Sequence, residues 1–207
     1  MSPNDKNTFS YRTIAQKGSG LYKEKGSRFL GFAMHVADEM QAKSEIENLR
    51  KAYFDARHHC YAWMLGADKR RTRAFDDGEP NHSAGDPILG QIRASGLTYV
   101  LVVVVRYFGG TKLGVGGLMT AYKAAAEEAL KNATTKECEM TERVILRYPY
   151  PSTPEVMKLV KDFDLKITGQ RFEEDCLLQA ELPLRNKEAF LMKIDLLLAL
   201  GSSLKRE

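Results

Sequence analysis

A glycine-rich segment at residues 106–118 combines residue types that can bind an anion. It follows an apolar run at residues 99–105 and precedes a stretch of helical periodicity at residues 118–130. Glycine permits positive φ and lets backbone N–H groups converge, and a helix N-terminus adds the positive end of its dipole. We therefore expect an anion-binding loop, with a tightly packed strand-to-helix connection as the alternative. Its candidate residues are Arg106, Gly109, Gly110, Lys112, Gly114, Gly116 and Gly117.

This segment matches neither of the common nucleotide-binding motifs. Gly109 and Gly114 have the spacing of a P-loop, but Val115 and Gly116 follow where lysine and serine or threonine belong. The dinucleotide pattern Gly-x-Gly-x-x-Gly fails as well, because Met119 occupies the position of its third glycine. We expect neither ATP nor NAD, and no other cofactor.

An acidic turn just before Pro80 is the second candidate for chemistry. Its carboxylates Asp76, Asp77 and Glu79 have the chemistry to hold a divalent cation or to act as a general base, and His59 is a further acid–base candidate. The spacing is not that of an EF-hand. We favour ion pairs between this turn and the arginines just upstream, and we expect no metal.

Basic and aromatic residues alternate along the first two-thirds of the chain. Planar guanidinium groups suit phosphate, and aromatic rings stack on bases, so the pattern is compatible with RNA. Core packing explains the aromatic residues equally well. The additional candidate cations are Arg57, Arg70, Arg71 and Arg73.

Composition limits the class of protein. The formal net charge is +4, with 20 Lys and Arg against 16 Asp and Glu in residues 1–140 and 11 against 11 in residues 141–207. This excess is below that of a dedicated duplex DNA binder. The apolar run at 99–105 is too short to span a membrane, residues 1–10 lack the apolar core of a secretory leader, and the three scattered cysteines indicate reduced thiols. We expect a cytoplasmic protein.

Periodicity and turn residues predict an α+β protein with a boundary near residue 140. The first part contains two strands within 11–36, a helix at 39–54 capped by Asp38, a strand at 60–65, a helix at 87–94 that ends at Gly96, the strand at 99–105 and the helix at 118–130. A polar linker is expected at 131–141. The remainder reads β-α-β-β-α, with a helix that starts at Thr153-Pro154 and another capped by Asn186, and predicts a ferredoxin-like domain with a short final strand.

Several motifs together resemble the YigZ/IMPACT family. They lie in the family order between residues 25 and 122, and two positions depart from the expected pattern, at 81–83 and at 119–120. The motifs are Lys25-Gly26-Ser27-Arg28-Phe29, Asp55-Ala56-Arg57-His58-His59-Cys60-Tyr61-Ala62, Asp76-Asp77-Gly78-Glu79-Pro80, Ala84-Gly85-Asp86-Pro87-Ile88-Leu89 and Val105-Arg106-Tyr107-Phe108-Gly109-Gly110 with Leu113-Gly114-Val115-Gly116-Gly117-Leu118.

This resemblance implies a fold for each part of the chain and a role in translation. Residues 1–138 would form a domain like ribosomal protein S5 domain 2, and residues 139–207 a ferredoxin-like domain similar to the last domain of translocation-type elongation factors. The eukaryotic family members regulate translation initiation under amino-acid starvation, and the family has no established catalytic activity.

Three functions follow as hypotheses from the sequence. The leading one is a non-enzymatic cytoplasmic protein that binds RNA or a ribosome-associated partner and modulates translation. We expect no membrane among its partners. The rival is an enzyme acting on a small phosphorylated or carboxylated substrate held by the glycine-rich segment. A third is a protein-interaction module that docks an acidic partner.

Overall fold

The computed structural model of the chain describes residues 9–206. Most of the segment 1–10, from which the expectation about a secretory leader was drawn, lies outside the described residues. The chain divides into two compact units, Tyr11–Cys138 and a second unit that joins the residues up to Ser10 with those from Glu139 onward. In the described part of the chain, none of the helices combines the length and apolar character needed to cross a lipid bilayer.

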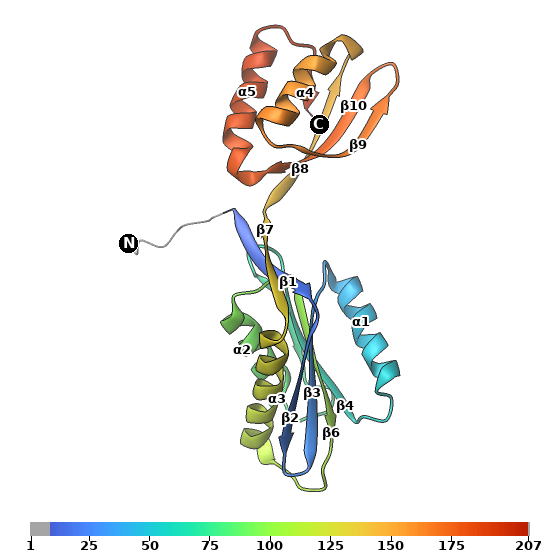
Figure 1. Cartoon of the computed structure of the whole chain (residues 1–207), viewed down its shortest axis with the longest axis vertical. Helices are drawn as coiled ribbons and strands as arrows, with labels where there is room; N and C mark the ends of the chain where they lie inside the picture. Colours follow the sequence, from blue (N-terminus) through green and yellow to red (C-terminus); the bar gives the residue numbers. More distant parts are fainter. Residues whose placement is uncertain (1–8, 207) are drawn as a thin grey trace, which may run out of the picture. The chain divides into compact units, whose positions relative to one another are not determined.

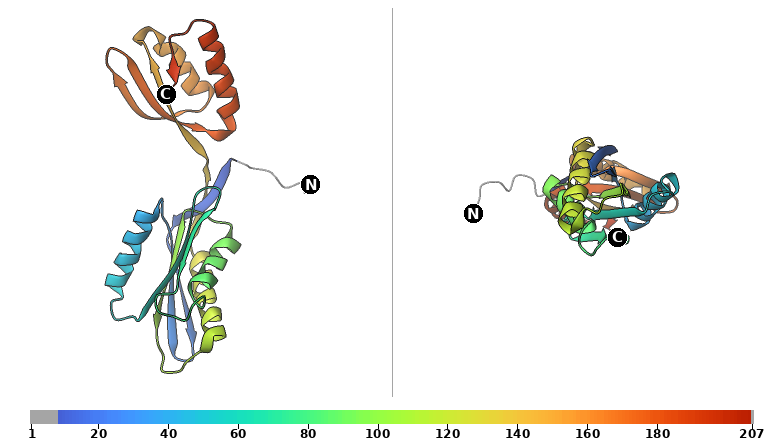
Figure 2. Two further views of the ribbon diagram at one scale, coloured as in Figure 1. Left: turned by 180° about the vertical axis from the view of Figure 1, so that it is seen from behind. Right: turned by 90° about the horizontal axis from the view of Figure 1, so that it is seen from below.

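The first unit is built around a five-stranded antiparallel sheet in the order β2-β3-β6-β4-β5. Helices α2 and α3 cover one face of this sheet and α1 covers the other (Figures 1 and 2). The strands are β2 (Gly18–Glu24), β3 (Ser27–His35), β4 (His58–Leu65), β5 (Arg71–Phe75) and β6 (Val100–Tyr107). The helices are α1 (Glu39–Ala52), α2 (Gly85–Ser95) and α3 (Gly114–Lys131).

Strand β6 lies at the centre of this sheet and is buried from Val100 to Arg106. Its even-numbered valines pack under α2 and α3, and its odd-numbered residues pack under α1. Burial on both faces explains why this strand reads as a continuous apolar run instead of an alternating one. The same alternation places Arg106 on the face covered by α2 and α3.

Helix ends in the first unit follow local sequence signals. The Asp38 carboxylate accepts the Gln41 N–H at 2.8 Å, and the Gln41 side chain accepts the Ala37 N–H at 2.7 Å, so the expected N-cap of α1 is confirmed. Gly96 ends α2 with φ of 69°, as expected. Helix α3 begins four residues earlier than its apolar periodicity indicated.

Three segments differ from the sequence expectation, and one of them is β5, because no strand was expected at residues 71–75. The polar stretch expected as a linker contains strand β7 (Thr134–Glu139), which pairs with β1 (Ser10–Gln16). Residues 11–36 therefore hold parts of three strands instead of two. Strand β7 is exposed along most of its length, so it carries little of the apolar alternation by which strands are recognised.

The second unit has the ferredoxin-like order β-α-β-β-α-β that the sequence predicted. Its four-stranded sheet runs β11-β8-β10-β9, and α4 and α5 cover one face of it (Figure 1). The Asn186 side chain makes no cap but donates to the Phe163 carbonyl at 2.9 Å, so that predicted cap is wrong. The elements are β8 (Thr141–Tyr148), η1 (Tyr150–Ser152), α4 (Thr153–Asp162), β9 (Lys166–Phe172), β10 (Cys176–Pro183), η2 (Leu184–Asn186), α5 (Lys187–Ala199) and β11 (Lys205–Arg206).

Candidate anion-binding site

The N-terminus of α3 is exposed and has no side-chain cap. The connection from β6 runs through residues 108–113, and Gly114, Gly116 and Gly117 belong to the first turn of the helix instead of to the loop before it. The first turn contains no acidic residue. Because the first N–H groups of a helix have no intrahelical acceptor, this turn presents donors and a partial positive charge to solvent.

The turn between β2 and β3 packs directly against this loop. The Gly109 N–H donates to the Ser27 hydroxyl at 3.1 Å, and Ser27 is fully buried. A Cβ on Gly109 would lie 1.9 Å from the Gly26 carbonyl carbon, so the two backbones touch where a side chain has no room. This contact holds the hairpin and the loop together as one structural element.

Exposed cations surround the loop at this end of the sheet. Lys112 lies in the loop itself, and Lys25 lies in the β2–β3 turn that packs on it. Arg28 pairs with Tyr107 across β3 and β6, and its guanidinium stacks 4.8 Å from that ring, which packs on the α1 face and not on the face of α3. Arg57 precedes His58, which pairs with Arg106, so it reaches the same end of the sheet. We call Lys25, Arg57 and Lys112, together with the first turn of α3, the loop surface.

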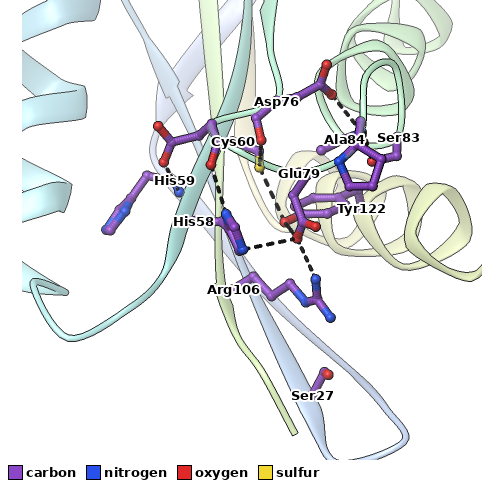
Figure 3. A network of polar contacts seen from close by, with 12 residues as sticks. Ser27, His58, His59, Cys60, Asp76, Glu79, Ser83, Ala84, Arg106 and Tyr122 are labelled. Atoms are coloured by element: carbon purple, nitrogen blue, oxygen red, sulfur yellow. Dashed lines mark hydrogen bonds and ion pairs between the residues drawn. The ribbon is translucent and has the colours of Figure 1, made fainter. Parts of the chain in front are cut away.

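Arg106 is not part of the loop surface, which corrects the sequence expectation. Its side chain is 7% exposed, and its Nη1 lies 2.6 Å from the Glu79 carboxylate. The Tyr122 hydroxyl donates to the same carboxylate oxygen at 2.7 Å, and the His58 Nε2 lies 4.0 Å from it (Figure 3). The Nε of Arg106 is buried and has no hydrogen-bond partner among residues 9–206. This charge neutralises Glu79 instead of facing a ligand.

The other two carboxylates of the acidic turn organise backbone. Asp76 accepts hydrogen bonds from the N–H groups of Ala84 and Gly85 at 2.9 and 2.8 Å (Figure 3). Its carboxylate therefore caps the N-terminus of α2, although it precedes Gly85 by nine residues in the sequence. Asp77 pairs with Arg50 at 3.0 Å and accepts the His59 N–H at 2.7 Å. The ion pairs expected for this turn exist, but their partners are Arg50 and Arg106 instead of the arginines just upstream.

The buried groups near this turn are held in their neutral forms. Burial raises the pKa of the Cys60 thiol, whose sulfur lies 2.9 Å from the Asp76 carbonyl oxygen, and burial likewise raises the pKa of Tyr122. Burial lowers the pKa of His59, and within the described part of the chain its Nε2 has no hydrogen-bond partner. A protonated buried thiol is a poor nucleophile. Among residues 9–206, no three His, Cys, Asp or Glu side chains are grouped as metal ligands.

The structure separates three predicted arginines from the loop surface. Arg71 pairs with Leu65 at the end of β4 opposite to His58, and Arg70 precedes it. Arg71 forms an ion pair with Glu39, and Arg73 lines a hollow of about 580 Å³ between α1 and the sheet. These cations therefore lie at the far end of the sheet or on its α1 face. The strand register that places them there is not visible in sequence spacing.

Sequence reasoning about chemistry missed Ser27, Lys25 and Tyr122. The first two lie in a motif that served only as a turn and as a sign of kinship. Tyr122 fits an apolar helix stripe, and nothing in that stripe indicates that its hydroxyl meets Glu79. The glycines at 26 and 109 were the available signal, because both allow the backbone approach that joins the hairpin to the loop.

The fold and this site define a two-unit α+β protein in which an uncapped, glycine-rich helix start is framed by cations. The family profile of the Impact N-terminal domain matches residues 25–130. The IMPACT family member YigZ of Escherichia coli (strain K12) is 36% identical over 172 residues, which cover 82% of this chain and 84% of that protein. The chain belongs to the IMPACT family.

Other comparisons agree with this assignment. An IMPACT family member of Haemophilus influenzae is 32% identical over 86% of this chain and 88% of its own. The protein IMPACT homolog of Saccharomyces cerevisiae is 34% identical over 44% of this chain and 36% of its own. A crystal structure of a hypothetical protein superposes with a TM-score of 0.76 at 33% identity, covering 97% of each chain.

Proposed function

We propose that this protein is a cytoplasmic, non-enzymatic RNA-binding protein that acts in translation, and that the loop surface contacts phosphate. The observation that carries the proposal is the exposed start of α3, with no side-chain cap and no acidic residue in its first turn. Backbone N–H groups at such a helix start bind anions, and the nearby cations add salt-dependent affinity. The link to translation rests on the family, whose eukaryotic members regulate translation initiation.

The carboxylates of the acidic turn already interact with other groups of the protein, which favours a binding function over catalysis at this site. Each of Asp76, Asp77 and Glu79 already accepts hydrogen bonds from the protein or pairs with an arginine. A general base needs a lone pair directed at substrate. We therefore place the function in the loop surface and assign the acidic turn to its support.

The test is crosslinking of the protein to RNA in cells, with the variant Lys25→Ala/Lys112→Ala. Both lysines are exposed, so the variant removes two cations from the loop surface without opening the core. The matched control is Lys43→Ala/Lys136→Ala, which removes two exposed lysines from α1 and β7. Arg106 is unsuitable for this test because its loss would leave Glu79 buried without its cation.

We expect RNA crosslinks for the wild-type protein and the control, and a clear reduction for Lys25→Ala/Lys112→Ala. In vitro, the slope of log affinity against log salt should fall by about 1.4, because each lost phosphate contact on a single strand contributes about 0.7. Equal crosslinking by both variants would show that the loop surface is not the RNA-binding site. Absence of crosslinks in the wild type would show that the protein does not bind RNA in cells.

A further inference from the structure

We propose that the open face of the sheet in the second unit is a separate surface for the RNA phosphate backbone. The inference rests on the proposed function in that it takes RNA as the ligand. It concerns a part of the chain to which neither the sequence nor the family assigns a role. Three observations carry it: the strand register, the distribution of charge and the residue types on the face.

The strand register collects cations on one face of the sheet. Val144, Leu146 and Tyr148 of β8 point into the core under α4 and α5, so Arg143 and Arg147 point to the opposite face. Residues directly opposite each other in neighbouring strands share a face. The cross-strand partners of these two arginines on β10 and β11, and the partners of those β10 residues on β9, therefore lie on the same open face. The charged residues of this face are Arg143, Arg147, Lys166, Arg171, Glu181 and Lys205.

Charge in this unit is segregated although its total is zero. Residues 141–207 hold 11 Lys and Arg and 11 Asp and Glu, yet the open face carries five of the cations and one of the acids. Its formal charge is therefore +4, and the rest of the segment carries −4. Such a field on one face attracts a polyanion and steers its approach.

The positions of the cations match an extended backbone. Arg143 and Arg147 lie four residues apart on β8, roughly 13 Å at 3.3 Å per residue. Arg171 lies two strands away from Arg147, roughly 10 Å at about 4.8 Å per strand. Arg143, Lys166, Arg171 and Lys205 are exposed, while Arg147 is half-buried. A chain of phosphates can thus meet successive cations across the sheet.

The remaining residues of the face indicate how RNA would be bound. They include Ile145, Leu177 and Gln179, and within the four strands as described no aromatic side chain lies on this face. Aromatic rings are the usual platform for base stacking on a sheet, and here only arginine planes are available for it. We therefore infer backbone contacts without base-sequence preference. Arginine, the most frequent cation here, provides a planar fork for phosphate oxygens.

The experiment measures binding of the full-length protein to fluorescent oligouridylate by anisotropy at several salt concentrations. The test variant is Arg143→Gln/Arg171→Gln, and the matched control is Lys158→Gln/Lys161→Gln on α4, where both lysines are exposed. Thermal unfolding of both variants verifies that the fold is retained. We expect roughly tenfold weaker binding for the test variant, a salt slope lower by about 1.4, and little change for the control.

Each other outcome has a distinct meaning. If the wild type binds and the Arg143/Arg171 variant binds equally well, the open face is wrong and the proposed function stands. If the wild type binds no RNA, the proposed function and this inference both fail. If polyglutamate competes as well as oligouridylate for Lys25→Ala/Lys112→Ala, which keeps the open face, that face recognises acidic protein, and its RNA assignment is overturned.

Discussion

The ion pair between Glu79 and Arg106 lies beneath the loop surface and supports it from inside. Their side chains are 4% and 7% exposed, and Tyr122 donates a further hydrogen bond to the carboxylate. Removal of one member of a buried pair leaves the other charge uncompensated, which costs about 3–5 kcal/mol. The pair therefore acts on the site through folding and through the placement of α3.

We expect Arg106→Gln to lower the free energy of unfolding by about 3–5 kcal/mol. Glu79→Gln/Arg106→Gln should recover part of this loss, because neither charge then remains alone. Arg28→Gln serves as the control, since Arg28 is an exposed cation of the neighbouring strand. Urea denaturation of the four proteins measures the coupling. A loss for Arg106→Gln no larger than that for Arg28→Gln would contradict the buried-pair assignment.

Two histidines make the first unit sensitive to acid. Burial lowers the pKa of both His35 and His59 below the value of about 6.5 that they have in an unfolded chain. Between the folded and unfolded pKa values the unfolded state binds more protons, so unfolding becomes easier as the pH falls. Stability should be fully present above about pH 6.5 and decrease below it.

The measurement is the free energy of unfolding between pH 7.5 and 5 for the wild type, His59→Gln and His35→Gln/His59→Gln. We expect the dependence on pH to flatten stepwise along this series, because each substitution removes one group whose protonation opposes folding. A slope that stays the same in the double variant would show that other groups govern the response to acid.

At the scale of elements, the hairpin β2–β3 and the loop after β6 form one unit through Gly26 and Gly109. We expect Gly109→Ala to displace the hairpin, because its Cβ would meet backbone at 1.9 Å. Gly116→Ala should stabilise the protein by about 0.5–1 kcal/mol, since nothing lies within 4 Å of that Cβ and alanine favours helix. Thermal unfolding and RNA affinity are measured for both.

The two alanine variants separate loop geometry from helix stability. RNA affinity should fall for Gly109→Ala and persist for Gly116→Ala, because the second substitution leaves the N–H groups of α3 in place. If both variants bind as the wild type does, the joined hairpin and loop are not required for binding. If both lose affinity, the first turn of α3 needs glycine for access of the ligand.

Most elements were predictable because their signals are local. The cap at Asp38, the end of α2 at Gly96 and the apolar run of β6 all depend on residues close in sequence. Strand β7 was missed because its partner β1 lies more than a hundred residues away and its own residues are exposed. The loop surface was found only in part, because the contact of Gly26 with Gly109 brings Lys25 to it and cross-strand register keeps Arg71 away from it.

At the scale of the whole molecule, the net charge of the second unit does not reveal that its charges are unequally divided between the two faces of its sheet. Residues 141–207 hold equal numbers of acids and bases, so the sequence gives them no net charge. The period of two along each strand and the pairing of β8, β9 and β10 sort the same residues onto opposite faces. Composition reports a sum, whereas binding depends on where each charge points.

Two RNA surfaces on one chain predict a dependence on RNA length. Once one surface holds an RNA, the second binds the same strand at a high effective concentration, provided that the strand reaches both. We expect affinity for oligouridylate to rise steeply beyond a threshold length instead of in proportion to it. Below the threshold, Lys25→Ala/Lys112→Ala and Arg143→Gln/Arg171→Gln should each remove only the contribution of its own surface.

Above that length, either variant alone should cancel most of the gain, because bridging requires both surfaces. The combined variant should lose, in addition, the binding that the remaining surface gives to each single-surface variant on long RNA. The same anisotropy measurement over a series of oligouridylate lengths checks this, with Lys158→Gln/Lys161→Gln as the control. A smooth, proportional rise in affinity with length in all proteins would mean that the surfaces bind RNA independently, so that the covalent connection between the two units adds nothing to binding.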